Sequence, residues 1–71
     1  MKLKKLVKYA KKKHGKGWLA IDSDNEPFWY SIKPKRWTTI WARGSSNGNS
    51  LAIPEHYTGS KHWTKTLREV K

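Results

Sequence analysis

The chain has 71 residues, no cysteine, and a formal net charge of +11 from sixteen Lys and Arg against five Asp and Glu. This length predicts one small basic domain, residues 1–71, with a stability of only about a few kcal/mol. The composition excludes disulfides and thiolate metal sites, and no run approaches the roughly 18 apolar residues of a membrane span. We therefore expect a cytoplasmic protein.

The positive charge is concentrated at the amino end. Residues 1–17 contain eight lysines and no acid, a charge of +8, whereas residues 18–71 hold eight Lys and Arg against five acids, only +3. Concentrated positive charge selects polyanionic partners. The lysine-rich segment is thus the first candidate for a contact surface.

A helix is predicted over residues 2–13. Its apolar positions follow the i, i+3, i+4, i+7 spacing of one helical stripe: Leu3, Leu6, Val7 and Ala10. Gly15 follows and suits a left-handed C-terminal cap. Lysines at this density repel one another, so the helix needs a sheet to pack against.

Short β-strands are predicted to follow the helix. Turn-forming residues separate the segments 18–22, 28–32 and 37–42, and a polar loop, 43–50, precedes a brief fourth strand over 51–53. Such short links favour antiparallel hairpins. The predicted fold is α+β, an N-terminal amphipathic helix packed on a small antiparallel three- to four-stranded β-meander.

The conformation of residues 55–71 stays open between two alternatives. Trp63, Leu67 and Val70 have the i, i+4, i+7 spacing of a short closing helix. The Thr-Lys-Thr content favours a loosely attached extended segment almost equally.

Period-two alternation divides the strand residues between the two faces of the predicted sheet. The face beneath the helix is predicted to hold Leu19, Ile21, Phe28, Tyr30, Ile32 and Ile40. The opposite face then holds Trp18, Trp29, Trp37 and Trp41. Four exposed indoles would make a patch that is rare on a monomer. Either the C-terminal tail covers them through Trp63 and Leu67, or they form a binding surface.

The residues do not suggest catalysis, a metal or a cofactor. Asp22, Asp24 and Glu26 resemble the start of a calcium loop but lack its glycine and distal acid, and a turn explains them better. His56 and His62 have no acidic or thiol partner at ligand spacing. We expect a protein that is not an enzyme.

Basic residues mixed with aromatic ones point to nucleic acid. Lysine and arginine neutralise phosphates, and exposed rings stack on unpaired bases. The predicted phosphate-binding residues are Lys4, Lys5, Lys8, Lys11 and Lys12 on the helix, extended by Lys33, Lys35, Arg36 and Arg43; the predicted base-stacking residues are Trp29, Trp37 and Trp41. Sequence specificity should be weak, because lysine is a point charge rather than a bidentate base reader.

Several short motifs resemble those of small, mostly uncharacterised proteins encoded by tailed bacteriophages. The shared pattern is a Trp-x-Ala-x-Asp-x-Asp start over residues 18–24, then Tyr30, Pro34 and Trp37, then a closing Trp-x-x-Thr-Leu over residues 63–67. The resemblance implies a phage context and the host cytoplasm, and no mechanism. Many of those proteins are acidic where this chain has its lysines, so residues 2–16 would be its specialised part.

Two other functions remain open. A phage-encoded inhibitor or adaptor would dock on an acidic surface of a host protein, with tryptophans as hot spots and lysines steering the encounter. A basic amphipathic helix can also lie on a membrane surface, but here the apolar stripe is thin.

Overall fold

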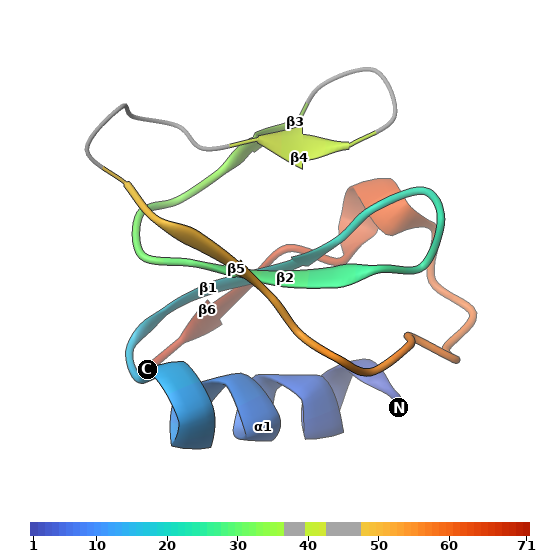
Figure 1. Cartoon of the computed structure of the whole chain (residues 1–71). Helices are drawn as coiled ribbons and strands as arrows, with labels where there is room; N and C mark the ends of the chain where they lie inside the picture. Colours follow the sequence, from blue (N-terminus) through green and yellow to red (C-terminus); the bar gives the residue numbers. More distant parts are fainter. Residues whose placement is uncertain (37–39, 43–47) are drawn as a thin grey trace.

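The computed structural model describes residues 1–36, 40–42 and 48–71; the predictions for Trp37 and Arg43 fall outside these ranges. Its elements in chain order are α1 (Leu3–His14), β1 (Gly17–Ile21), β2 (Pro27–Tyr30), β3 (Lys35–Arg36), β4 (Trp41–Ala42), β5 (Ser50–Ala52), the 3-10 helix η1 (Trp63–Lys65) and β6 (Arg68–Val70). Figure 1 shows α1 against one face of a four-stranded sheet and the β3–β4 ribbon beyond the other. We call these faces the helix side and the ribbon side. The predicted α+β class is confirmed.

The helix ends at His14, one residue beyond the predicted end, and its cap differs from the prediction. Gly15 has φ 89° and ψ −158°, a region open essentially to glycine alone, instead of the left-handed helical conformation. Its N–H donates to the carbonyls of Ala10 and Lys11 at 3.2 and 3.0 Å. The glycine therefore stops α1 and turns the chain directly into β1.

The main sheet is antiparallel and four-stranded, within the predicted three to four strands, but its order β5-β2-β1-β6 differs from that of a meander. The order matches a Greek key, in which the fourth strand returns beside the first. Of the expected third strand over 37–42, the described residues 40–42 contain β4, which pairs with β3 in the separate ribbon. Pro34, which follows β2, has no N–H to donate to a neighbouring strand. Just after β2, the N–H of Ser31 donates to the carbonyl of Asn49 at 3.0 Å. The neighbour of β2 is thus β5, close to the predicted fourth strand.

The tail adopts the extended alternative, and the closing helix was wrong. β6 pairs with β1, with Val70 opposite Gly17 and Arg68 opposite Leu19. Thr66 fixes the turn before β6: its buried hydroxyl donates to the Trp63 carbonyl at 2.6 Å and accepts the Ile21 N–H at 3.0 Å. One threonine thereby ties the tail to β1.

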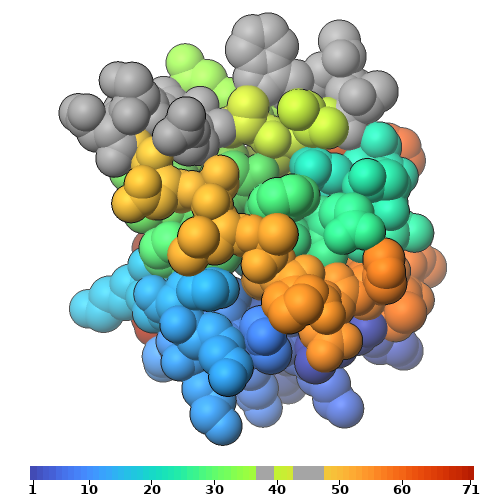
Figure 2. All heavy atoms as spheres, in the orientation of Figure 1, coloured from blue at the N-terminus to red at the C-terminus, as the bar shows by residue number. Residues whose placement is uncertain are grey.

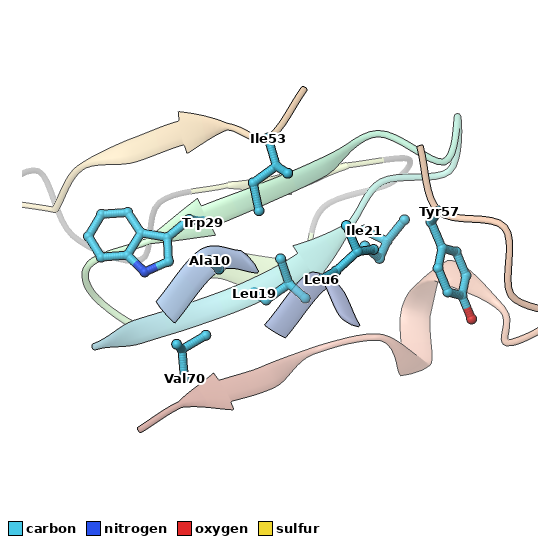
Figure 3. Close-up of a cluster of buried hydrophobic side chains, with 8 residues drawn as sticks. All are labelled: Leu6, Ala10, Leu19, Ile21, Trp29, Ile53, Tyr57 and Val70. Atoms are coloured by element: carbon cyan, nitrogen blue, oxygen red, sulfur yellow. The ribbon is translucent and has the colours of Figure 1, made fainter. Parts of the chain in front are cut away.

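The helix-side core differs from the prediction in the second strand. Figure 3 shows its buried members, Leu6, Ala10, Leu19, Ile21, Trp29, Ile53, Tyr57 and Val70. Leu19 and Ile21 are confirmed, but Trp29 takes the inward place expected for Phe28 and Tyr30. The reason is the turn over residues 22–26 between β1 and β2, in which Asn25 has φ 67° and which sets Leu19 opposite Trp29.

Two further residues were misplaced, because alternation alone does not reveal where the strands of the main sheet end. Ile32 and Ile40, predicted to be core, are 41% and 49% exposed because both lie outside the main sheet. Trp29 faces α1, and its indole Nε1 donates to the Gly15 carbonyl at 3.2 Å. The indole therefore secures the end of the helix.

The ribbon side has its own small core of Ala20, Tyr30 and Trp41, against which Trp18, Phe28, Trp63 and Leu67 pack. Trp41 is only 8% exposed, and its Nε1 donates to the carbonyls of Ile21 and Trp63 at 3.0 and 3.3 Å. The rings of Trp41 and Trp63 meet edge to face with centroids 6.3 Å apart. For Trp41, the alternative in which the tail covers the tryptophans is the correct one.

A buried carboxylate anchors the ribbon to the sheet. Asp22 is 7% exposed, and its Oδ1 accepts the backbone N–H of Trp41 at 2.8 Å. Burial raises the pKa of Asp22 above 3.8; the N–H of Trp41 opposes this rise, and the charges of Asp24 and Glu26 add to it. Burial also raises the pKa of Tyr30, whose hydroxyl donates to the Trp41 carbonyl at 3.1 Å.

The raised pKa of Asp22 predicts a pH-dependent stability. The folded state holds this proton more tightly than the unfolded state, so the stabilisation is complete below the unfolded pKa of 3.8 and is lost as pH rises through the folded value. Asp22→Asn keeps an acceptor for Trp41 and does not titrate. The unfolding free energy of the wild type minus that of Asp22→Asn should therefore fall with pH, measured by urea unfolding at about pH 3, 5 and 7. A difference that stays constant or rises would contradict this.

Candidate nucleic-acid interface

The lysines of α1 line the surface opposite and beside its apolar stripe. Leu6 and Ala10 are buried against the sheet, whereas Lys4, Lys8 and Lys11 are exposed at i, i+4, i+7 spacing. Lys5 and Lys12 form a second exposed row next to them, so the five predicted helix residues do share one continuous surface. Figure 2 shows the blue side chains of this segment projecting along the lower side of the molecule.

These cations have no acidic partners. Across residues 1–36, 40–42 and 48–71, the one ion pair joins His56 Nδ1 to Glu26 Oε1 at 3.4 Å, and no Lys or Arg takes part in a salt bridge. The last turn of α1 is entirely basic, which suits the negative end of the helix dipole. The charge on α1 is therefore available to an anionic partner.

An open groove of about 520 Å³ runs between α1 and β6. Leu3 and Val7 supply apolar lining, Lys4 and Lys8 come from the helix, and the other contributors are Lys61, Arg68 and the single acid Glu69. Arg68 is held in place, because its Nη1 donates to the carbonyls of Lys65 and Leu67 at 3.1 and 2.8 Å. Four cations thus surround one groove.

Lys61 and Arg68 are site residues that sequence reasoning missed. More than fifty residues separate them from Lys4 and Lys8, and only the pairing of β6 with β1 brings the tail beside the helix. A weak strand pattern was present in the sequence over Arg68, Glu69 and Val70. The helical spacing of Trp63, Leu67 and Val70 suggested a helix there instead.

Most of the acidic residues lie near the C-terminal end of β1, whereas basic residues lie near its N-terminal end. Asp22, Asp24 and Glu26 occupy the β1–β2 turn, and Glu55 belongs to a segment held beside it, where the Tyr57 N–H donates to the Asn25 carbonyl at 3.1 Å. Four of the five acids of the chain are gathered there. Lys16 marks the other, basic end, where α1 passes into β1 and the C-terminus also lies (Figure 1).

The other predicted site residues that the structure describes do not join the helix lysines on one face. Lys35 and Arg36 lie in β3, in the ribbon beyond the opposite face of the sheet (Figure 1). Lys33 lies near the basic end, with its Nζ 5.5 Å from the ring centroid of Trp18. Trp29 and Trp41 are each 8% exposed and serve the two cores, so neither indole is a free platform for a base.

Comparisons of the chain with protein-family models, curated proteins and solved structures find no match. Within the described residues, no three His, Asp or Glu side chains gather as a metal site would require. The helices of that same part of the chain are all too short and polar to cross a bilayer.

Proposed function

We propose that this chain is a non-catalytic nucleic-acid-binding accessory protein, encoded by a phage and acting in the host cytoplasm. One observation carries the proposal: within the described residues the lysines on α1 lack acidic partners, and two of them, Lys4 and Lys8, lie across one groove from the cations Lys61 and Arg68. A concentration of positive charge without internal compensation favours a polyanion.

The groove is suited to a sugar–phosphate backbone. Lys4, Lys8, Lys61 and Arg68 supply cations from both walls, and the apolar lining of Leu3 and Val7 can contact sugar carbons. The acidic turn at the far end of β1 repels the same ligand and so limits where it lies. Recognition through phosphates positions a strand without reading its sequence.

The first test is the salt dependence of binding. If the four groove cations each neutralise one phosphate, the logarithm of the association constant should fall against the logarithm of salt concentration with a slope of about −3.6 for a duplex or −2.8 for a single strand. Between about 50 and 200 mM salt, affinity should then drop about 50- to 150-fold. Fluorescence anisotropy with labelled DNA and RNA measures both values. Binding that is absent at low salt, or independent of salt, would exclude the proposal.

A second candidate function is a phage-encoded inhibitor or adaptor that docks on an acidic surface of a host protein. The groove favours it through its apolar lining, and through the edge position of β6, whose outer backbone groups can pair with another chain. Pulldown from bacterial lysate with and without nuclease separates the two functions. A partner protein retained at stoichiometric amounts after nuclease treatment supports docking.

A further inference from the structure

A second open cleft, of about 550 Å³, lies at the basic end of the molecule. The half-buried indole of Trp18 lines it together with Lys16, Lys71 and Glu69. Trp18 points to the ribbon side, packs against the core of Tyr30 and Trp41, and leaves part of its ring accessible. This is a different place from the groove between α1 and β6, although Glu69 lines both.

We propose that the Trp18 cleft binds an unpaired nucleobase, which makes single-stranded nucleic acid the preferred ligand. The inference rests on the proposed function and specifies its substrate class. An aromatic ring beside cations is the arrangement that single-strand-binding proteins use, because any base has a π face to stack while phosphates lie against the cations. Lys16, Lys33 and Lys71 provide those cations around Trp18.

Trp18 suits this role better than the other described tryptophans. Trp29 and Trp41 are core residues. Trp63 is half-buried, but its ring is already engaged edge to face with Trp41 and lies 6.0 Å from the ring of His62. Trp18 combines an accessible ring with a surrounding of lysines.

Lys33 does not block the ring. Its ammonium lies over the indole at 5.5 Å, a cation–π contact made by a flexible, exposed side chain. Base stacking on an indole is generally stronger than such an exposed contact. An incoming base therefore displaces Lys33, whose ammonium is then free to contact the adjacent phosphate.

Glu69, the acidic residue that lines the cleft, determines where the backbone of a bound strand is expected to lie. Glu69 repels phosphate, so the backbone should lie toward Lys16 and Lys71. Because Glu69 borders both openings, a strand that leaves the α1–β6 groove reaches Trp18 by passing around β6. The groove then holds phosphates and the cleft holds a base of the same strand.

The experiment compares single strands of equal charge with and without bases, and adds a duplex, in which the bases are paired. Labelled strands of about 12 nucleotides are used, oligo-dT, oligo-U, an abasic DNA strand of the same length, and a duplex. Wild-type protein should bind oligo-dT about 5- to 150-fold more tightly than the abasic strand, the range expected for one stacked base. Comparing the affinity for oligo-U with the affinity for oligo-dT shows whether the protein prefers RNA or DNA.

Substitutions at Trp18 complete the test. Trp18→Leu keeps an apolar side chain over the core and should abolish the preference for oligo-dT, while leaving the affinity for the abasic strand unchanged. Trp18→Phe keeps a smaller ring and should retain part of the preference. Circular dichroism and the urea midpoint verify that each variant folds. If Trp18→Leu does not fold, base stacking is still tested by the preference for oligo-dT over the abasic strand, measured in the wild type and in Trp18→Phe.

The failures of the two proposals are distinguishable. Equal affinities of the wild type for oligo-dT and the abasic strand, or an unchanged preference in Trp18→Leu, overturn base stacking while phosphate binding stands. No binding to any nucleic acid overturns both proposals. A poly-glutamate peptide of the same charge that binds as tightly as oligo-dT, and loses affinity in Trp18→Leu, assigns the cleft to acidic protein segments instead.

Discussion

Reversing two groove charges, Lys4→Glu with Lys8→Glu, should weaken binding to a labelled oligonucleotide about 100-fold or more at low salt. Both side chains are exposed, line the groove, and have no acidic partner within the described residues. Each reversal removes a phosphate contact and places a negative charge beside the strand. Anisotropy titrations of the variant and the wild type in the same buffer measure the effect.

The matched control is the double variant Lys35→Glu with Arg36→Glu. It changes the net charge by the same amount, but its residues lie in β3, in the ribbon beyond the opposite face of the sheet. We expect only the modest loss that follows from a lower net charge. Equal losses in the two double variants would show that overall charge, and not the groove, attracts the ligand.

Replacing Trp41 by alanine should leave the chain largely unfolded at room temperature. A Trp→Ala change in a core removes about 3–5 kcal/mol, and here it also leaves the carbonyls of Ile21 and Trp63 without the indole N–H. The loss is as large as the total stability expected for a domain of this size. Urea unfolding followed by circular dichroism measures it.

Two further variants serve as comparisons for the urea midpoint of Trp41→Ala. Trp41→Phe keeps a ring in the ribbon-side core but removes the Nε1 donor, so its urea midpoint should lie between those of the wild type and Trp41→Ala. Trp18→Leu alters a half-buried residue at the margin of the same core and should shift the midpoint least. A Trp41→Ala variant with the wild-type midpoint would show that the ribbon is dispensable for folding.

The sequence predicted the helix and its apolar stripe because both depend on local spacing. Residues 2–13 were expected and Leu3–His14 are helical, with Leu6 and Ala10 buried as the stripe requires. The first hairpin was also located correctly, and Leu19 and Ile21 face the helix. These features depend on residues close together in the chain.

The errors arose where the register of a turn or a long-range strand pairing decides the structure. A single residue of register exchanges the faces of a strand, and the Asn25 turn turned Trp29 inward in place of Phe28 and Tyr30. The pairing of β6 with β1 overrode the helical spacing of residues 63–70. Of the candidate site, only the helix lysines could be found from sequence, because Lys61 and Arg68 reach the groove through the folded tail.

The α1–β6 groove brings together segments that are distant in the chain, with Lys4 and Lys8 on one wall and Lys61 and Arg68 on the other. The amino end is also fastened elsewhere, since the Thr58 N–H donates to the Met1 carbonyl at 2.9 Å. A partly synthesised or frayed chain therefore has no complete groove. Under the proposed function, a strand bound in the groove would hold the two ends together and, by mass action, would raise the melting temperature of this small domain. Binding of the strand and completion of the fold would then be coupled.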